Sequence, residues 1–382
     1  MDNGTFVVAS LPGRGGVNPY VDLFYNALQA EGVKLYEEPQ IDMNWAQAHF
    51  AHIDALHFHW PEYIWRGSQR RVVPSGLRTQ LRARVPGAWR VFTWLDKIAR
   101  SRWLGGLQRQ RNKRYGIECL REFVVSARAS GVTIIWTLHN LESHENWSSL
   151  DRRGFEMLAT VSDLVICHSN YARTEFLARY PSNCPVIVMP HGNYDGVYPQ
   201  PRPRSQVLTD LGLDPLLPVV GCIGAMRAYK GIDVAIQAVR QYQGRLQLIC
   251  AGEPHGSFPL AEAERLTRET KGAVLLPHRL SDQAFADCCN ACDVILLPYR
   301  KITGSGALLA ALTLGRAVVA SDLPYFREVL SEHSSAGALV KPGDAAALVA
   351  GIQQLLQRDP VIREHSAWEA AAQYSWSLVI RP

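Results

Sequence analysis

The second half of the chain opens with the stretch Gly221-Cys222-Ile223-Gly224-Ala225-Met226-Arg227-Ala228-Tyr229-Lys230-Gly231-Ile232-Asp233. The apolar run Val219–Ile223 predicts a buried strand, and the spacing of apolar residues in Ile232–Gln241 predicts a helix. Between them, Arg227 offers a planar fork and Lys230 a point charge, both suited to phosphate oxygens, and a helix starting at Gly231 adds a favourable dipole. We therefore expect a phosphate site here. Two solvated cations are the alternative.

The same alternation of apolar runs and helix-length segments extends outward over most of the chain. Runs that are apolar nearly throughout are typical of strands buried on both faces of a parallel sheet. They lie at Thr5–Leu11, Val33–Tyr36, Ala55–His59, Val132–Leu138, Leu164–His168, Val186–Met189, Val219–Ile223, Leu246–Ala251, Ala273–Leu276, Val294–Leu297, Ala317–Ser321 and Ala338–Val340. Helices are predicted at Tyr20–Ala30, Leu107–Ser130, Tyr171–Tyr180, Ile232–Gln241, Ala261–Thr270, Asp282–Ala291, Ser305–Leu314 and Asp344–Leu356.

A Pro-rich stretch, Tyr198–Pro218, separates the two series and is typical of a domain linker. Two such series predict an α/β protein with two Rossmann-like, doubly wound domains that face each other across a cleft. We expect the N-terminal domain over residues 1–197 and the C-terminal domain over residues 198–364.

Composition agrees with a globular protein. The 382 residues are 47% hydrophobic and 20% charged, which excludes a mostly disordered or collagen-like chain. No run approaches the ~18 apolar residues of a membrane span, and the first residues lack the basic start of a signal peptide. The eight scattered cysteines favour reduced thiols in a cytoplasm. A metal or redox site at Cys288, Cys289 and Cys292 is the alternative for the only cluster.

The charge is concentrated in one segment. Arg66–Arg114 contains fourteen basic residues and one acidic residue, a net of +13, whereas the whole chain carries +5. Within it, Ala88–Leu104 places Trp89 and Phe92 on one side of a possible helix. A basic, Trp-bearing amphipathic stretch suits an anionic membrane surface. A solvated face over core aromatics is the alternative. Nucleic acid is not expected as a partner, because no nucleic-acid-binding motif accompanies the charge.

Polar clusters follow several predicted strands of the first half, where ligands bind in open α/β sheets. The loop Leu11–Pro19 contains Gly15, Gly16 and Asn18, and its alternative is a flexible turn. His59 and Glu62 follow the third strand and could perform acid–base work. His139 and Asn140 follow the fourth, with Glu142, His144 and Glu145 nearby, where a metal site is the less favoured alternative. His191 closes the domain.

A further polar cluster follows the predicted strand Val294–Leu297 in the second half of the chain. Thr303, Gly304, Ser305 and Gly306 precede a helix, and their hydroxyl and N–H groups predict a second anion site. An ordinary helix cap is the alternative, because Ser and Thr are good capping residues.

Together these motifs resemble GT-B-fold glycosyltransferases, especially family 4 and its relatives that build bacterial surface polysaccharides. Arg227, Lys230 and Gly231 resemble the loop that holds the donor diphosphate, and Ala291–Tyr299 resembles the strand that follows. Thr137–Asn140 resembles the strand end whose His approaches the transferred sugar. Gly15-Gly16 and His191-Gly192 also resemble motifs of the group, the first being the loop under the diphosphate. Glu328 matches the Glu of the P-E-V/I motif that follows in the group.

One departure from family 4 concerns two glutamates eight positions apart in and after the second anion site. Alignment on Gly315 places Ile302 and Ala310 at those positions, so both carboxylates are missing. Ribose binding is then expected from Glu328, Asp322 or Tyr299. The pattern looks closer to divergent exopolysaccharide transferases, including inverting β-mannosyltransferases.

The resemblance implies transfer of a sugar from a GDP- or UDP-linked donor to a glycan or a lipid-diphosphate-linked acceptor, at the inner face of a membrane. Arg227, Lys230 and the 303–306 N–H groups would neutralise the leaving diphosphate, so no cofactor and no metal is expected. His139 and Glu62 are the candidates for the base of an inverting reaction; in a retaining one His139 would bind the donor sugar. Asn18, His59, Asn140 and His191 are expected at the acceptor or sugar. In GT-B proteins the C-terminal helix crosses back to the N-terminal domain, which we expect of residues 365–382.

Two other functions stay open at this point. One is a different GT-B enzyme, such as a nucleotide-sugar epimerase, and the other is a non-catalytic or nucleic-acid-binding α/β protein.

Overall fold

The computed structural model describes residues 5–15, 18–36, 39–66, 102–142, 147–256 and 258–381. The predicted amphipathic helix of the basic segment therefore lies almost wholly outside the described residues, together with Gly16, His144 and Glu145.

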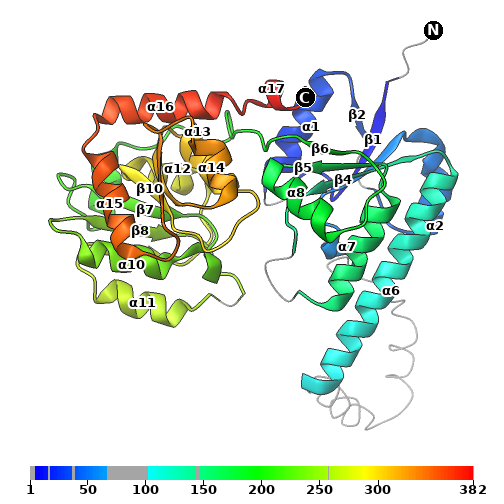
Figure 1. Ribbon diagram of the computed structural model, residues 1–382, viewed down its shortest axis with the longest axis horizontal. Coiled ribbons are helices and arrows are strands. Elements are labelled where there is room, and N and C mark those ends of the chain that lie inside the picture. The colour runs from blue at the N-terminus through cyan, green and yellow to red at the C-terminus, as the bar shows by residue number, and fades with distance from the viewer. Residues whose placement is uncertain are drawn as a thin grey trace, which may run out of the picture.

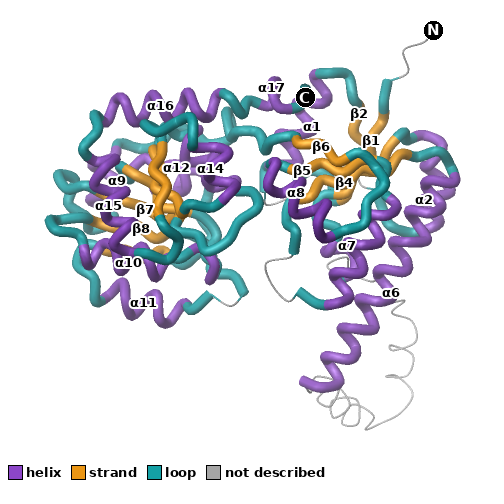
Figure 2. Tube along the Cα trace, viewed as in Figure 1, coloured by secondary structure: helices purple, strands orange, loops and turns teal. Residues whose placement is uncertain are grey.

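Two separate parallel sheets of six strands form the molecule (Figure 2). The N-terminal sheet has the order β2-β1-β3-β4-β5-β6, and the C-terminal sheet has the order β12-β11-β10-β7-β8-β9. The strands are β1 Val7–Leu11, β2 Lys34–Tyr36, β3 Ala55–Phe58, β4 Thr133–Leu138, β5 Leu164–Cys167, β6 Val186–Val188, β7 Val219–Ile223, β8 Gln247–Ala251, β9 Ala273–Leu276, β10 Val294–Leu297, β11 Ala317–Ser321 and β12 Gly337–Val340. All twelve coincide with predicted strands, so the prediction of two doubly wound domains is confirmed.

Helices cover both faces of each sheet (Figure 1). They are α1 Tyr20–Ala30, α2 Met43–His49, α3 Glu62–Trp65, α6 Arg102–Ala129, α7 Ser149–Val161, α8 Asn170–Arg179, α9 Arg204–Asp210, α10 Ile232–Gln241, α11 Leu260–Arg268, α12 Asp282–Ala291, α13 Gly306–Thr313, α14 Pro324–Leu330, α15 Ala345–Leu356, α16 Pro360–Ala372 and α17 Trp376–Val379. Each sheet separates two apolar clusters of buried side chains, one on each face, as a doubly wound fold requires.

Several of these helices were not predicted. Helix α9 lies within the Pro-rich stretch, where Pro203 occupies its cap position, and it packs against α12. Helix α7 begins with a capping box in which Ser148 and Asp151 satisfy each other's backbone N–H groups. Its sequence signal was therefore present at Ser148 and Asp151.

Strand order reverses at one point in each sheet, and this point positions the site. In the N-terminal sheet β1 and β3 are neighbours, and in the C-terminal sheet β7 and β10 are neighbours. Ligands of open α/β sheets bind beyond the carboxyl ends of the strands at such a switch point. The loops after these four strands are therefore the first places to look for a site.

The C-terminal segment runs back to the N-terminal domain. Helix α16 packs on α13 of the C-terminal domain. Because α16 is continuous over Pro360–Ala372, the expected boundary at 364/365 falls inside it, and the chain crosses to the N-terminal domain only after this helix ends. Helix α17 then lies against α1 (Figure 1). Trp376 Nε1 donates to the carbonyl of Asn193 at 2.9 Å, which ties this tail to the segment that joins the domains.

Candidate active site

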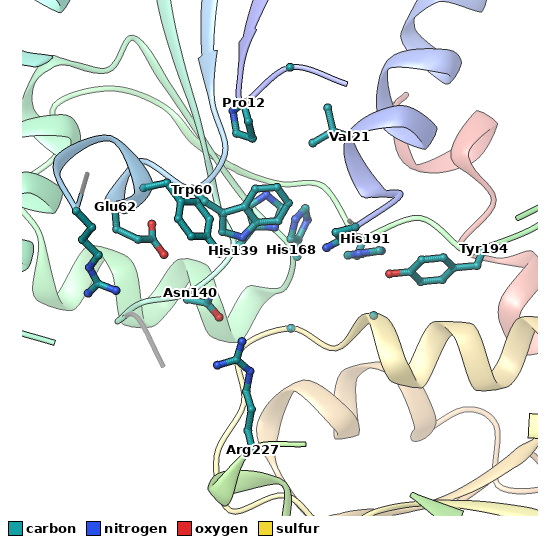
Figure 3. A pocket seen from close by; sticks show the side chains of 16 residues that line it. Pro12, Val21, Trp60, Glu62, His139, Asn140, His168, His191, Tyr194 and Arg227 are labelled. Atoms are coloured by element: carbon teal, nitrogen blue, oxygen red, sulfur yellow. The ribbon is translucent and has the colours of Figure 1, made fainter. Parts of the chain in front are cut away.

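A cleft of about 620 Å³ lies between the two domains, at both switch points. All four loops after β1, β3, β7 and β10 contribute to its walls. The lining residues are Pro12, Gly13, Asn18, Val21, Trp60, Glu62, Tyr63, Arg66, His139, Asn140, His168, His191, Tyr194, Arg227, Gly304 and Gly306. Figure 3 shows Arg227 reaching from the C-terminal domain toward His139, Asn140 and Glu62 on the opposite wall.

His139 is at the centre of the N-terminal wall. It follows the last residue of β4, and its ring stacks on Trp60 at 4.1 Å between centroids. Its Nε2 lies 3.2 Å from Nδ1 of His59, within hydrogen-bond distance. Burial, with the nearby imidazole of His168, lowers the pKa of His139 well below its usual value. His139 is therefore a neutral imidazole at neutral pH.

Four more imidazoles are buried around it. His57 is held from both sides, with Nδ1 2.7 Å from the Tyr25 hydroxyl and Nε2 2.8 Å from the Thr137 hydroxyl. His168 Nδ1 donates to the carbonyl of Met189 at 2.9 Å, and His191 Nδ1 donates to that of Gly192 at 2.7 Å.

Burial lowers the pKa of each of these imidazoles. The values are about 3 for His57, about 4 for His168 and about 3 for His191, and the pKa of His59 is well below its usual range. The cluster is therefore uncharged at neutral pH. The imidazoles that line the cleft can hydrogen-bond to a ligand without repelling the guanidinium of Arg227.

Glu62 provides the one carboxylate among the lining residues. It begins helix α3, its side chain is nearly buried, and desolvation raises its pKa above the usual value. A carboxylate with a raised pKa beside a cleft is suited to accept a proton.

A network of charges centred on the buried Asp151 lies near Glu62. Asp151 accepts hydrogen bonds from Trp65 Nε1 at 2.9 Å, Arg66 Nε at 3.0 Å and Lys113 Nζ at 2.9 Å. These partners outweigh the burial of Asp151 and hold its pKa well below the usual range. The network ties Arg66, which also lines the cleft, to the long helix α6.

The C-terminal wall is cationic and rich in glycine. Arg227 follows β7, and Gly304 and Gly306 lie at the start of α13. A Cβ on Gly306 would lie 2.3 Å from the hydroxyl of Tyr194, so a side chain there would displace Tyr194 where the domain-joining segment meets this helix. A helix N-terminus beside a guanidinium is an anion-binding arrangement.

Gly231 explains the shape of the Arg227 loop. Its φ is +69°, and a Cβ there would lie 2.1 Å from the carbonyl oxygen of Pro298. A residue with a side chain would therefore be strained and would also separate the loops after β7 and β10.

Lys230 lies beside the cleft, not on its lining. It occupies a small cavity that Gly224 and Tyr299 also line, and its Nζ lies 5.4 Å from the centroid of the buried Tyr299 ring. Burial and the neighbouring Arg227 lower the pKa of Lys230 to about 8. The ammonium group of Lys230 therefore loses its charge at a pH only slightly above neutral.

Other predicted residues are engaged elsewhere in this structure. His59 is fully buried, Ser305 caps α13 through Leu308 N, and Gly15 donates to Asp22 at 3.2 Å. Thr303 and Asp322 are half-buried, and the latter pairs with Arg327.

Glu328 reaches the other domain. It accepts hydrogen bonds from the backbone N–H groups of Asn170 and Tyr171.

Of the predicted site residues, the cleft brings together Asn18, Glu62, His139, Asn140, His191, Arg227, Gly304 and Gly306.

Sequence reasoning missed Trp60, Arg66, His168 and Tyr194 among the lining residues. His168 ends the predicted strand Leu164–His168, so the rule that polar residues after strands meet ligands could have found it. Trp60 lies between two residues that were considered, and Arg66 was interpreted only as part of the basic segment. Tyr194 had no local signal.

In the described part of the chain, no three His, Cys, Asp or Glu side chains are grouped so as to hold a metal ion. Among the same described residues, no helix has the length and apolar character needed to cross a membrane.

Comparison with known proteins shows which sequences this chain resembles. Residues 217–358 match the family described as glycosyl transferases group 1. The chain is 24% identical over 309 residues to a GDP-mannose:glycolipid 4-beta-D-mannosyltransferase of Xanthomonas campestris pv. campestris, covering 80% of this chain and 70% of that protein.

Two solved structures share the fold. Sucrose-phosphate synthase from Thermosynechococcus elongatus has a TM-score of 0.63 and 18% identity, covering 98% of this chain and 96% of that one. Anabaena HepE, solved in complex with UDP and glucose, has a TM-score of 0.64 and 14% identity, covering 98% and 97%.

The two facing domains define the GT-B fold. With the sequence matches, they identify the chain as a glycosyltransferase that resembles family 4. The two alternative functions that the sequence left open are not favoured by these similarities.

Proposed function

We propose that this glycosyltransferase moves a hexose from a nucleotide-diphosphate sugar to a glycan or lipid-linked acceptor in the assembly of a surface polysaccharide. The observation that carries the proposal is the cleft itself. Arg227, Gly304 and Gly306 form one wall, and Glu62 and His139 face them from the other domain. A leaving diphosphate and an attacking hydroxyl would thus be held on opposite sides of the transferred sugar.

The donor diphosphate belongs, on this proposal, to the C-terminal wall. Arg227 and the N–H groups that open α13 would stabilise the charge that grows as the glycosidic bond breaks, and Lys230 would support them from its cavity. This arrangement needs no divalent metal. Turnover that is unchanged by a chelator would agree with that part of the proposal, and restoration by Mg²⁺ or Mn²⁺ after chelation would refute it.

Glu62 is proposed as the base that takes the proton of the acceptor hydroxyl. Its raised pKa and its place on the wall opposite Arg227 support this role. The products would then have inverted anomeric configuration, because the hydroxyl attacks from the face opposite the leaving diphosphate.

GDP-mannose is the first donor to test, and a glycolipid the first acceptor. This choice rests on the mannosyltransferase of Xanthomonas campestris, whose name specifies both. The donor base and sugar are otherwise open between GDP- and UDP-linked hexoses.

We further propose that the enzyme works at the cytoplasmic face of a membrane, bound through the basic segment Arg66–Arg114. The described part of that segment supports this. Helix α6 projects beyond the sheet of its domain (Figure 1), and Arg111 and Arg114 are exposed on it. Lysine and arginine near an anionic surface each contribute about 1 kcal/mol of attraction.

Two experiments test these proposals separately. Release of GDP or UDP is measured across a panel of nucleotide sugars, with and without glycolipid, and Arg227→Ala is the control. Interconversion of the sugar without acceptor would indicate an epimerase instead. Flotation with vesicles of anionic or neutral lipid tests the surface, and equal recovery with both lipids would refute membrane binding while leaving the transfer reaction standing.

A further inference from the structure

The hydrogen bond between two neutral imidazoles, His59 and His139, has a definite direction. A hydrogen bond between the two facing nitrogens needs a proton on one of them and not on the other. Because both rings are uncharged at neutral pH, each carries only one ring proton. Either His59 Nδ1–H donates to His139 Nε2, or His139 Nε2–H donates to His59 Nδ1. The two choices leave different groups on the far sides of the rings.

The environment of His59 decides between them. His59 is fully buried, and its other nitrogen, Nε2, has no hydrogen-bond partner among the described residues. Were His139 the donor, His59 Nε2 would carry a proton that is buried without an acceptor. Buried N–H groups are rarely left in that state, whereas an unpaired acceptor is tolerated more often. The proton therefore lies on His59 Nδ1.

The neighbouring His168 follows the same pattern. Its Nδ1 faces the carbonyl of Met189, which can only accept, so the proton of that ring is on Nδ1. His168 Nε2 then carries a lone pair and no proton, and this nitrogen too is buried without a hydrogen-bond partner among the described residues. The orphaned nitrogen of His168 is thus an acceptor, which is the state inferred for the orphaned nitrogen of His59.

We propose that His59 is a positioning residue that holds His139 in the tautomer with its proton on Nδ1. His139 then donates a hydrogen bond to a substrate oxygen, and its Nε2 is closed to a proton by His59. The inference rests on the proposed function for the identity of that substrate, a sugar, and it leaves proton abstraction to Glu62.

The surroundings of His139 fit a donor better than a base. The titratable side chains around it are His57 on β3, His59 after β3, His168 after β5, His191 after β6 and Tyr20 on α1. Burial and the surrounding imidazoles lower the pKa of His139, so they disfavour the imidazolium that a base becomes.

The tautomer can be read without any substrate. Long-range ¹H–¹⁵N spectra of the full chain labelled with ¹⁵N-histidine distinguish Nδ1–H from Nε2–H, with His139→Asn used for assignment. We expect the Nδ1–H form of His139 in the wild type. The Nε2–H form would overturn the proposal, and this result holds whether or not the proposed transfer reaction is found.

Two substitutions at His59 separate positioning from packing. Asparagine places an amide N–H near the position of Nδ1, whereas phenylalanine keeps the ring and removes the donor. We expect His59→Phe to lower kcat about 10–100-fold, the scale for losing the partner that orients a functional imidazole, while His59→Asn retains most activity. In His59→Phe, His139 Nε2 no longer accepts a hydrogen bond and is free to take up a proton. A loss of activity that is absent from the wild type therefore appears on the acid side of the pH profile. Equal kcat and equal pH profiles for the two variants would overturn the proposal.

Discussion

The carboxylate of Glu328 accepts a hydrogen bond of 2.7 Å from the backbone N–H of Tyr171, and a second of 2.8 Å from Asn170. These contacts join α14 of the C-terminal domain to the first turn of α8 in the N-terminal domain. A carboxylate is stabilised there because the first N–H groups of a helix lack internal partners and carry the positive end of its dipole. The domains are thus fastened at a point away from the segment that joins them.

Removing this carboxylate should loosen the pair of domains. We expect Glu328→Ala to increase the radius of gyration of the free enzyme in small-angle scattering, while the free energy of unfolding changes by less than about 1 kcal/mol. Glu332→Ala is the matched control, since Glu332 is an exposed carboxylate just beyond the same helix. Identical scattering from all three proteins would contradict the fastening role.

Replacement of Glu62 should separate chemistry from donor binding. We expect Glu62→Gln to lower kcat at least about 100-fold and to leave the Kd of the nucleoside diphosphate unchanged, because the amide keeps the shape but cannot accept the proton. Glu142→Gln, at an exposed carboxylate paired with Arg179, is the control.

The pH profile gives an independent check on Glu62. Its pKa is raised by burial, so the base is lost as pH falls through that raised value, and activity should decline on the acid side. A Glu62→Gln enzyme with wild-type turnover would exclude this residue as the base.

Lys230 should make donor binding sensitive to alkaline pH. Because burial and Arg227 lower its pKa to about 8, the free enzyme loses this positive charge as pH rises through that value. The Kd of a nucleoside diphosphate should therefore rise between about pH 7 and pH 9. Arginine stays charged throughout, so Lys230→Arg should flatten the dependence. A nucleoside without phosphates is the control ligand, and the same alkaline rise for it would refute the assignment to Lys230.

Gly192 and Trp376 should be coupled in stability. A Cβ on Gly192 would lie 2.2 Å from the indole of Trp376, so Gly192→Ala should displace the C-terminal tail and cost roughly 1–3 kcal/mol of unfolding free energy. In a Trp376→Ala background the same change should cost much less. Gly304→Ala is the control, since nothing lies within 4 Å of a Cβ there. Additive losses in a double-mutant cycle of chemical denaturation would show that the tail does not press on Gly192.

The sequence predicts the fold well because most of the buried strands are nearly continuous apolar runs that end before a glycine, a proline or a polar residue. For the same reason His139 and Glu62 could be assigned to the cleft, since both follow strands of the parallel sheet. Helix α9 escaped prediction because a proline-rich stretch resembles a linker, although Pro203 leads directly into a helix.

Other features depend on contacts between distant residues. Glu328 meets a helix more than 150 positions earlier in the chain, and local sequence carries no trace of such a partner. The sequence predicts His59 at the acceptor or sugar, yet the residue is fully buried on the same side of the strand end as His57, as the two-residue period of a strand allows. Lys230 is only three positions from Arg227 in the motif, but its side chain lies in a separate small cavity that Tyr299 also lines.

The central claim is that Arg227 holds the donor diphosphate on the C-terminal wall of the cleft. The most direct test is the rate of nucleotide release from the preferred nucleotide sugar by wild-type enzyme, Arg227→Ala and Arg300→Ala, the last at an exposed cation paired with Asp233. We predict a loss of about 100–1,000-fold for Arg227→Ala with an unchanged circular dichroism spectrum, and near wild-type release for Arg300→Ala. Wild-type release by a folded Arg227→Ala enzyme would contradict the account.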